Sequence, residues 1–337
     1  MKRRGRQLVA ILVVAGMVLA AGGSVRAGFG DILRRVRGEL GQVLLAHDVL
    51  VHPGEEVTLR ASLRGGFRLE GVGGVRIQFH LNERRIDQVT GDSNGNVQTR
   101  WTAPSEPGDY RIRVRVKPED QPEDEGRHVA PTRLLVAVRK ADAPIAIVDL
   151  DKTLVASGFH RVLLGAGAEP MEGSGVVLAR LGRTHTVVYL THRPDFLGPS
   201  SKQWLDAHGY PLGPVLTSTL GGLIEGSGTY KARQLADLAK NFKNLKVGIG
   251  DKVSDARAYA DRGLTSILIL PVDWADDDPE EFEDLASDLA ALPEAVHVVT
   301  NWAQVSAILF EGARQPPASM IRRLRGVAAD LRRRGKD

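Results

Sequence analysis

Two aspartates, Asp149 and Asp151, directly follow the apolar run Ile145–Val148. At the end of a β-strand, this spacing can direct both carboxylates to the same side of the chain. An Asp-x-Asp sequence alone is equally consistent with a polar loop that caps the following turn. Its meaning therefore depends on which other polar residues the fold brings to the same place.

Four further polar residues each follow a predicted strand or open a predicted helix. The carboxyl ends of parallel strands meet at one edge of a sheet, where ligands bind in folds of this type. We therefore expect these residues to converge with the first pair. They are Thr191, Lys231, Asp251 and Asp255.

Such a group of side chains suits phosphoryl transfer. Four carboxylates in one pocket repel one another unless a cation is present. A ligand set made only of oxygen atoms favours a hard ion, which predicts Mg²⁺ as the cofactor. A threonine and a lysine beside the ion supply donors for phosphoryl oxygens. Positioning and charge neutralisation of this kind carry most of the catalysis of phosphoryl transfer, so a phosphate ester is the expected substrate.

The elements that would hold these residues begin after residue 144. Apolar strands alternate there with amphipathic helices, which predicts an α/β domain of three layers around a parallel sheet, Rossmann-like, over residues 144–311. The strands are expected at 145–148, 186–190, 247–249, 267–270 and 296–299, and the helices near 175–181, 200–208, 231–242, 254–262, 280–292 and 302–310.

The preceding region, residues 43–140, alternates apolar and polar residues with period two. Turn sequences such as Asn94-Gly95 separate the short runs, which favours an antiparallel all-β sandwich. The segments 52–57, 95–104 and 108–110 resemble bacterial Ig-like domains. The whole chain is therefore predicted to have two domains, an Ig-like β-sandwich followed by the α/β domain.

Composition excludes several classes of function. The 337 residues include no cysteine, so disulfides, thiol nucleophiles and Cys-based metal sites are excluded. The net charge of +4 is unevenly placed, because residues 28–312 hold 32 basic and 39 acidic residues. A folded body with this balance does not favour nucleic acid as a partner.

The first 27 residues have the pattern of a secretory signal peptide. Met1–Gln7 is basic, Leu8–Ala21 is almost wholly apolar, and small residues at Val25–Ala27 predict cleavage after Ala27. The expected location is outside the cytoplasm, in the periplasm, on the cell surface or in the medium. An uncleaved membrane anchor is the alternative, although the apolar run is short for a membrane span.

The last segment, residues 313–337, contains eight basic and two acidic residues. Five apolar residues among the arginines have helical spacing, so the segment could form a basic amphipathic helix that contacts an anionic membrane. A solvated charged tail is the alternative. The apolar residues are Met320, Ile321, Leu324, Val327 and Leu331.

The polar residues also match, in order, the four motifs of the haloacid dehalogenase superfamily. Asp149-Leu-Asp-Lys-Thr153 resembles the first motif, Thr191 the second, Lys231 the third, and Gly250-Asp251 with Asp255 the fourth. The resemblance extends over roughly residues 144–310. It implies the fold predicted above and a phosphatase activity.

This resemblance also implies a role for each residue. Asp149 would attack phosphorus and form an aspartyl-phosphate intermediate, while Asp151 would protonate the leaving oxygen and later activate water. Thr191 would bind the phosphoryl group and Lys231 would offset its charge. Mg²⁺ would be held by Asp149, the backbone carbonyl of Asp151 and Asp251, with Asp255 as a further or outer ligand.

The segments 189–194, 204–216 and 231–235 resemble the catalytic region of lipins and fungal actin-patch phosphatidate phosphatases. That resemblance implies phosphatidate or a related lipid phosphate as substrate, with His192 and Arg193 beside Thr191 as substrate-binding residues. The short connections leave no room for a large lid, and an open site suits a bulky ester. Lys152 and Asp251 depart from the lipin pattern, which has Gly and usually Asn there.

Two other functions stay open. The substrate could be a soluble or protein-bound phosphate ester, or the chain could be a surface binding protein with a vestigial catalytic half. The complete set of motif residues argues against the second of these, because a protein without catalysis is free to lose Asp149 or Asp151.

Overall fold

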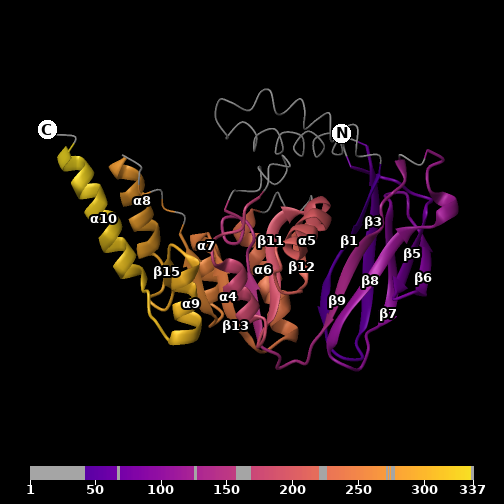
Figure 1. Cartoon of the computed structure of the whole chain (residues 1–337), viewed down its shortest axis with the longest axis horizontal. Coiled ribbons are helices and arrows are strands. Elements are labelled where there is room, and N and C mark those ends of the chain that lie inside the picture. The colour runs from indigo at the N-terminus through magenta and orange to yellow at the C-terminus, as the bar shows by residue number, and fades with distance from the viewer. Residues whose placement is uncertain are drawn as a thin grey trace.

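The computed structural model describes residues 42–66, 69–124, 127–156, 168–219, 226–270, 272, 274 and 278–334. It consists of an all-β domain and an α/β domain that lie side by side (Figure 1). The predicted signal peptide, residues 1–27, lies outside the described residues. None of the helices in the described ranges has both the length and the apolar character needed to cross a membrane.

The first domain is a sandwich of two sheets. One sheet has the order β1-β3-β4, with β7 also paired to β3, and the other has the order β2-β9-β8-β5-β6. We call these sheet A and sheet B. Sheet A comprises β1 (Gln42–Ala46), β3 (Glu56–Gly65), β4 (Glu70–Gly71) and β7 (Asn96–Thr102). Sheet B comprises β2 (Val49–Val51), β5 (Arg76–Leu81), β6 (Arg84–Thr90), β8 (Gly108–Val116) and β9 (Thr132–Val138).

Alternate residues of these strands fill the space between the sheets, as the period of two requires. On β3, for example, Leu59, Ala61 and Leu63 are buried in the sandwich core. The pairing differs from the antiparallel prediction at one place, where β2 runs parallel to β9. The chain leaves sheet A after β1 and joins sheet B through only three residues of β2, too short a run for an alternating pattern to predict.

The second domain is built on a six-stranded sheet, sheet C, in the order β12-β11-β10-β13-β14-β15. Every neighbouring pair is parallel, as predicted. The strand β10 lies in the middle between β11 and β13, so its carboxyl end lies at the centre of one edge of the sheet. The strands are β10 (Ile145–Val148), β11 (Thr186–Pro194), β12 (Val215–Ser218), β13 (Leu245–Gly250), β14 (Thr265–Ile269) and β15 (His297–Val299).

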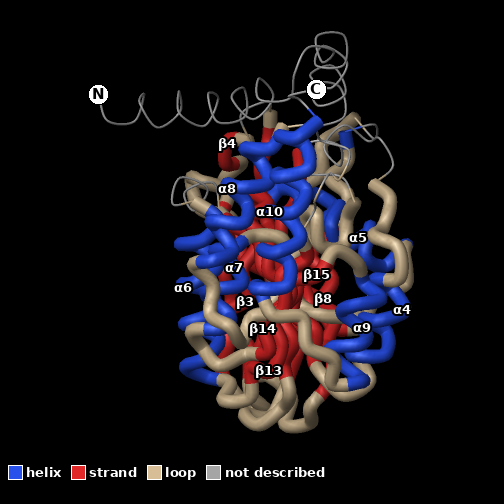
Figure 2. The backbone as a smooth tube through the Cα atoms, turned by 90° about the vertical axis from the view of Figure 1, so that its left-hand side faces the viewer, coloured by secondary structure: helices blue, strands red, loops and turns tan. Residues whose placement is uncertain are grey.

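Helices cover both faces of sheet C (Figure 2). Residues of α4, α5 and α9 pack on one face, and residues of α6 and α7 pack on the other. These helices are α4 (Ser174–Leu181), α5 (Gly198–Ala207), α6 (Ser227–Asn241), α7 (Val253–Ala260) and α9 (Trp302–Glu311). Two short 3-10 turns, η1 (Pro118–Asp120) and η3 (Asp195–Leu197), complete the described loops.

The predicted elements of this domain all have counterparts, and β12 is an additional strand that the sequence analysis did not identify. Its four residues lie between Pro214 and Thr219, without the long apolar run or the alternation that marks a strand. Its pairing with β11 forms it, through partners such as Leu190 and Leu216.

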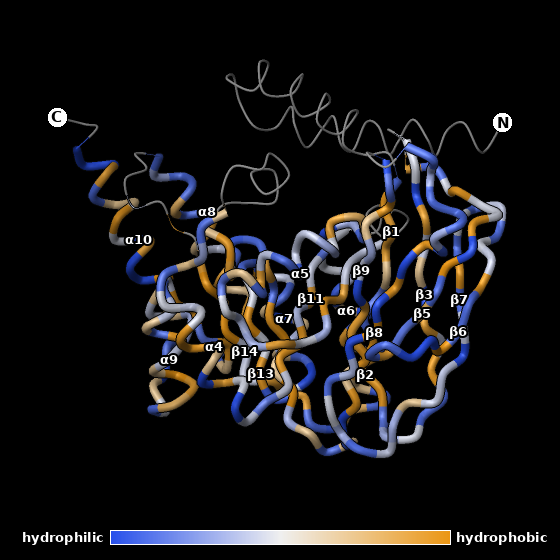
Figure 3. Tube along the Cα trace, turned by 45° about the vertical axis from the view of Figure 1, so that its right-hand side comes forward, coloured by the Kyte–Doolittle hydropathy of each residue, from blue (hydrophilic) through white to orange (hydrophobic). Residues whose placement is uncertain are grey.

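Residues 313–337, predicted as a basic tail, contain the helix α10 (Pro317–Arg334), which packs against α8 (Pro279–Ala290). Hydrophobic and hydrophilic residues interchange along α10 (Figure 3). Its Met320, Leu324 and Ala328 are buried in a cluster with α8. The apolar face considered for a membrane is therefore covered by protein, and the exposed part of α10 is its arginine-rich side.

Polar contacts join the two domains. Asp48, between β1 and β2, accepts hydrogen bonds from the backbone nitrogens of Leu135 (2.7 Å) and Val215 (2.9 Å). The Lys202 ammonium lies 2.6 Å from the same carboxylate. Arg139 adds a hydrogen bond of 2.7 Å from its Nε to Thr186 Oγ1. A buried carboxylate with this many donors is strongly held, so it fixes the sandwich against sheet C.

Candidate active site

Asp149 lies at the carboxyl end of the central strand of sheet C. All four residues of β10 are apolar and fully buried, and Asp149 itself is only 4% exposed. Its backbone nitrogen donates a hydrogen bond of 3.0 Å to the carbonyl of Ile249 on β13. The carboxylate is therefore presented by a rigid part of the domain, as a reacting group requires.

The chain reverses direction immediately after Asp149. The carbonyl of Leu150 accepts hydrogen bonds from the nitrogens of Leu154 (2.8 Å) and Val155 (3.0 Å). Lys152 adopts a φ of 55°, in the left-handed region that costs a residue other than glycine about 1 kcal/mol. The departure at this position from the glycine of lipins is therefore accommodated with some backbone strain.

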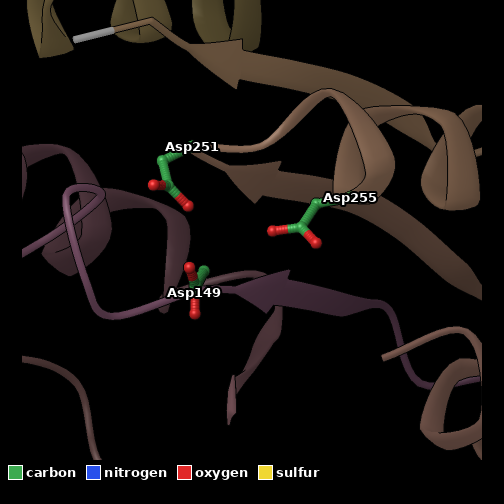
Figure 4. A group of neighbouring side chains, drawn as sticks. All are labelled: Asp149, Asp251 and Asp255. Carbon is green, nitrogen blue, oxygen red and sulfur yellow. The ribbon is translucent and has the colours of Figure 1, made fainter. Parts of the chain in front are cut away.

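Three of the predicted carboxylates meet at this edge of sheet C. Each of Asp149, Asp251 and Asp255 has an oxygen within 4.8 Å of the others, and Figure 4 shows the three side chains around one space. Asp251 directly follows β13, and Asp255 lies in the first turn of α7. Residues more than a hundred positions apart are thus brought together by the parallel sheet, as predicted.

The three carboxylates strongly affect one another. Burial and then the charge of Asp149 raise the pKa of Asp251 to about 7. Burial also raises the pKa of Asp255, despite the opposing charge of Lys231. One oxygen of each of these two aspartates, Oδ1, is buried without a hydrogen-bond partner among the described residues.

Lys231 reaches into this group from the start of α6. Its side chain is 1% exposed, and its Nζ lies 3.0 Å from Asp149 Oδ2 and 2.5 Å from Asp255 Oδ2. Burial lowers the pKa of Lys231, but the charges of Asp149 and Asp255 more than compensate, so the net shift is upward. The lysine therefore carries one positive charge against three carboxylates.

A divalent cation fits this donor set. The Oδ1 atoms of Asp251 and Asp255 have no hydrogen-bond partner among the described residues, and the three carboxylates outweigh the single positive charge of Lys231. A hard cation would bind these oxygen atoms and balance the excess negative charge. Phosphatases of the haloacid dehalogenase type typically use Mg²⁺. Asp149, Asp251 and Asp255 are the side chains that would hold it.

Asp151 has different hydrogen-bond partners from the other three carboxylates. Its two oxygens accept hydrogen bonds from Arg193 Nε (2.9 Å) and Nη2 (2.7 Å), a bidentate pair. Arg193 Nη1 also donates to Ser201 Oγ on α5, at 3.0 Å. The side chain of Arg193 is 1% exposed and that of Asp151 is 23% exposed, so the arginine is a buried support for a partly accessible carboxylate.

Thr191 and His192 lie within β11, which extends beyond the predicted end at residue 190 to Pro194. Thr191 is fully buried, and its Oγ1 accepts a hydrogen bond of 3.2 Å from the backbone nitrogen of Arg193. The His192 ring lies 5.6 Å from the ring of Tyr230, the residue before Lys231. Both residues belong to β11, the neighbour of β10, and His192 lies beside the residue that precedes Lys231.

The structure thus brings Asp149, Asp251, Asp255 and Lys231 into direct proximity. Sequence reasoning did not identify Ser201 or the pairing of Arg193 with Asp151, and it considered Arg193 only as a substrate-binding residue. Their side chains meet because α5 packs beside β11. The spacing of residues in the sequence does not predict that contact.

Comparison with known families gives one match, over residues 146–272, to the family model described as PITM 1-3, LNS2 domain. The match covers less than half of the chain and includes all the acidic residues of the site. It supports a lipin-like phosphatase domain of the haloacid dehalogenase type, and hence a phosphate ester as substrate. No curated protein matches the sequence significantly.

Similar solved structures include the D00-D0 domain of Intimin, with 10% identity, a TM-score of 0.22 and coverage of 29% of this chain and 46% of that one. A CARDB domain from Pyrococcus furiosus has 20% identity, a TM-score of 0.20 and coverage of 30% and 94%. The adhesin InvE of Yersinia pseudotuberculosis has 19% identity, a TM-score of 0.22 and coverage of 32% and 30%. The chain thus spans less than half of the Intimin structure, and these scores are too low to assign a fold.

Proposed function

We propose that this protein is a Mg²⁺-dependent phosphatase that hydrolyses phosphate monoesters through an aspartyl-phosphate at Asp149. The observation that carries the proposal is the meeting of Asp149, Asp251 and Asp255 around Lys231 at the carboxyl edge of sheet C. The family match over the same residues supports it.

In the first step, Asp149 attacks phosphorus and the bond between phosphorus and the ester oxygen breaks. Lys231 holds Oδ2 of Asp149, which leaves Oδ1 as the attacking atom. Asp151 enters this step protonated and gives its proton to the departing alcohol oxygen. The carboxylate that this leaves is the form that Arg193 holds with two hydrogen bonds, which keeps Asp151 in one orientation beside the leaving group.

In the second step, water attacks the phosphorus of the aspartyl-phosphate. Asp151, now ionised, takes a proton from this water, and the bond between phosphorus and Asp149 breaks. Inorganic phosphate leaves and both aspartates return to their starting states. The same residue therefore serves as acid and then as base.

Charge on the phosphoryl group is balanced by its surroundings. The Thr191 hydroxyl donates to a phosphoryl oxygen, and the Lys231 ammonium lies beside the oxygens that carry charge. Bound Mg²⁺ would neutralise phosphoryl charge and orient the substrate. Asp149, Asp251 and Asp255 would hold it by their side chains, together with the Asp151 backbone carbonyl.

The proposal is tested by phosphate release from p-nitrophenyl phosphate with Mg²⁺ and with a chelator. The Asp149→Asn variant removes the nucleophile while it keeps the shape of the side chain, so we expect activity to fall at least about 10³-fold. Asp237→Asn, on the exposed surface of α6, is the control and should keep full activity. Full activity in Asp149→Asn, or in the presence of the chelator, would contradict the mechanism.

We propose further that the substrate class includes lipid phosphates such as phosphatidate. The likeness of residues 189–194 and 204–216 to lipins supports this, as does the exposed arginine side of α10, which suits an anionic membrane. Phosphate release should be compared for phosphatidate in vesicles, soluble sugar phosphates and phosphopeptides. Activity on soluble or peptide esters alone would favour the other phosphatase function.

We propose finally that the protein is exported and that its signal peptide is cleaved after Ala27. The basic and apolar pattern of residues 1–27 supports this. The intact mass of the mature protein measures it. We expect a chain that begins at Gly28, and a chain that begins at Met1 would contradict cleavage.

A further inference from the structure

The outer face of sheet B carries a row of basic residues. On β8, the neighbours of Arg113 on both sides point into the sandwich core, so Arg113 points outward. The pairing of the strands places His80 of β5 and Arg133 of β9 on either side of it, and Arg85 of β6 beyond His80. Three arginines and a histidine therefore form one row across four neighbouring strands.

Two further arginines widen this row into a patch. Arg111 and Arg115 lie two residues from Arg113 along β8, on the same face of the strand. Burial, followed by the charge of Arg115, lowers the pKa of His80, with smaller contributions from the charges of Arg85 and Arg113. The charged groups are thus close enough to act on one another. We call this surface the basic patch, and its arginines are Arg85, Arg111, Arg113, Arg115 and Arg133.

The fold leaves the charge of the basic patch unbalanced. Four of its arginines are exposed, and none of the five forms an ion pair within the part of the chain that the structure describes. Arg115, which is half-buried, donates a hydrogen bond of 3.1 Å from its Nε to the side-chain oxygen of Gln78. Like charges directly opposite each other on neighbouring strands destabilise a sheet. An anionic partner would relieve this repulsion.

The arginines of α10 are more strongly neutralised than those of the basic patch. Arg325 and Arg332 pair with Glu283 of α8, and Arg333 pairs with Asp330 of its own helix. The basic patch is therefore a second basic surface, on the other domain, and its arginines have no acidic partners of this kind.

One end of the row of basic residues lies where the two domains meet. The carbonyl of Arg133 accepts a hydrogen bond of 3.1 Å from Lys202 Nζ on α5. The residue before this lysine, Ser201, accepts a hydrogen bond from Arg193, the partner of Asp151. The basic patch thus adjoins the helix that supports the proposed acid of the active site.

The arrangement of the arginines selects the kind of partner. Neighbouring strands are about 4.8 Å apart, and successive outward residues of β8 are about 7 Å apart, so the charges form a two-dimensional array. Guanidinium groups bind phosphate oxygens with two parallel hydrogen bonds. A bilayer that contains anionic phospholipids offers a surface covered with phosphate groups, and it matches both features.

Nucleic acid matches the basic patch less well. Single strands are bound by stacking of their bases on aromatic side chains, and His80 is the only ring on this face among the described strands of sheet B. The acidic balance of residues 28–312 also opposes a long polyanion. The lipid substrate proposed above favours the bilayer, because the enzyme must then act at its surface.

We propose that the basic patch binds the surface of a bilayer that contains anionic phospholipids. The proposal rests on the lipid phosphate substrate of the proposed function, and it gives the sandwich the role of holding the enzyme at the surface where that substrate lies. Binding of this kind is electrostatic, so it weakens as the salt concentration rises.

Binding is tested in the full chain with the Asp149→Asn substitution, which prevents catalysis. Co-sedimentation is measured with vesicles of phosphatidylcholine and with vesicles that also contain about 30% phosphatidylglycerol, and the difference is the part of binding that depends on anionic lipid. Each arginine near such a surface strengthens binding about fivefold. Arg85→Gln, Arg113→Gln and Arg133→Gln together should therefore weaken this part of binding at least about 30-fold.

The matched control removes three exposed arginines from other surfaces. Arg60→Gln and Arg100→Gln on sheet A, with Arg183→Gln just after α4, change the net charge equally and should weaken binding less than about threefold. Both triple variants keep residues 1–27 and α10, so neither segment can account for a difference between them. Thermal unfolding should show that both variants stay folded.

Phosphate release gives the second readout, in the chain with Asp149 intact. The variant of the basic patch should release phosphate from phosphatidate in the anionic vesicles at least about tenfold more slowly than the unaltered protein. Its rate with soluble p-nitrophenyl phosphate should change less than about twofold, because that ester does not require a surface.

Three results would overturn the inference. They are equal binding of the two triple variants to anionic vesicles, binding that about 0.5 M salt does not weaken, and binding of the unaltered patch to DNA or heparin without binding to anionic vesicles. A protein inactive on every ester would instead contradict the proposed function, and the sedimentation result would still decide whether the patch binds a bilayer.

Discussion

At the scale of single residues, Asp151, the proposed acid, is paired with Arg193. The guanidinium is buried and holds both oxygens of the carboxylate, while the carboxylate is partly accessible. A lysine at this position would keep the charge but lose the two parallel hydrogen bonds. The orientation of Asp151 would then be less well defined.

We therefore expect Arg193→Lys to lower kcat for an alkyl phosphate about 10–100-fold. The effect on p-nitrophenyl phosphate should be only about threefold, because p-nitrophenolate departs without protonation. Steady-state kinetics with both esters measure this difference. Arg183→Lys, at an exposed position just after α4, is the matched control. An equal loss with both esters would contradict a role of Arg193 in positioning the acid.

The pKa of Asp251 makes a second prediction at this scale. Mg²⁺ binds the ionised carboxylate, and the pKa of about 7 in the metal-free protein means that protons compete with the ion. We expect the affinity for Mg²⁺ to rise as the pH increases through about 7. Calorimetric titration with Mg²⁺ at several pH values measures it, and an affinity independent of pH between about 6 and 8 would contradict it.

The raised pKa of Asp251 also affects the free energy of unfolding of the metal-free protein, which should decrease as the pH rises. The folded-state pKa of Asp251 lies above the ordinary value of an aspartate, so the folded protein keeps a proton that the unfolded chain has lost. The contribution of Asp251 to the free energy of unfolding therefore falls as the pH rises from about 4 to about 7. Asp251→Asn should remove this contribution.

Most of the acidic residues of the site could be predicted because each follows a strand directly. Asp149 and Asp251 directly follow β10 and β13, and Asp255 is one helical turn further along the chain than Asp251. The parallel arrangement then places them together. The partner of Asp151 could not be predicted in this way, because it depends on the side-chain direction of Arg193 within β11.

At the scale of elements, α10 shows how a charged sequence can hide a structural role. Its arginines dominate the composition of the last 25 residues, but Met320, Leu324 and Ala328 on one side of the helix pack into the cluster with α8. The periodicity of the apolar residues was visible in the sequence. The sequence did not indicate that these residues pack against α8, because an amphipathic helix such as α8 can pack its apolar face against many different neighbours.

Leu324→Ala tests the role of α10 in the fold. Leu324 is fully buried, so we expect the free energy of unfolding to fall by about 2–4 kcal/mol. Denaturant unfolding monitored by circular dichroism measures it. Arg333→Ala, at an exposed position of the same helix, should change stability by less than about 0.5 kcal/mol. Similar effects of the two substitutions would contradict a structural role for the apolar face.

At the scale of the whole molecule, one carboxylate links the two domains. Asp48 accepts hydrogen bonds from Leu135 in the sandwich and from Val215 in the α/β domain, and it pairs with Lys202. These residues are separated by up to 167 positions, so their meeting could not be predicted from sequence. Each domain could be predicted by itself because its strand pattern is local, but the contact between them is not.

Asp48→Ala should therefore lower the free energy of unfolding by about 3–5 kcal/mol, because it leaves two buried N–H groups without an acceptor and removes the carboxylate that pairs with the partly buried Lys202 ammonium. Thermal and denaturant unfolding measure the loss. Asp237→Ala breaks an exposed pair with Lys240 and should cost less than about 0.5 kcal/mol. A loss below about 1 kcal/mol in Asp48→Ala would contradict a strong link between the domains.

The bond from Val215 to Asp48 also limits how this protein can assemble. Val215 belongs to β12, one lateral strand of sheet C, and on the other lateral strand the nitrogen of Val298 donates to the carbonyl of Gln315. An exposed edge strand can pair with a strand of another chain through backbone hydrogen bonds. Here one backbone donor of each edge strand is already occupied, by the sandwich on one side and by the segment before α10 on the other. The two edges of sheet C are therefore partly covered against backbone pairing with a strand of another copy.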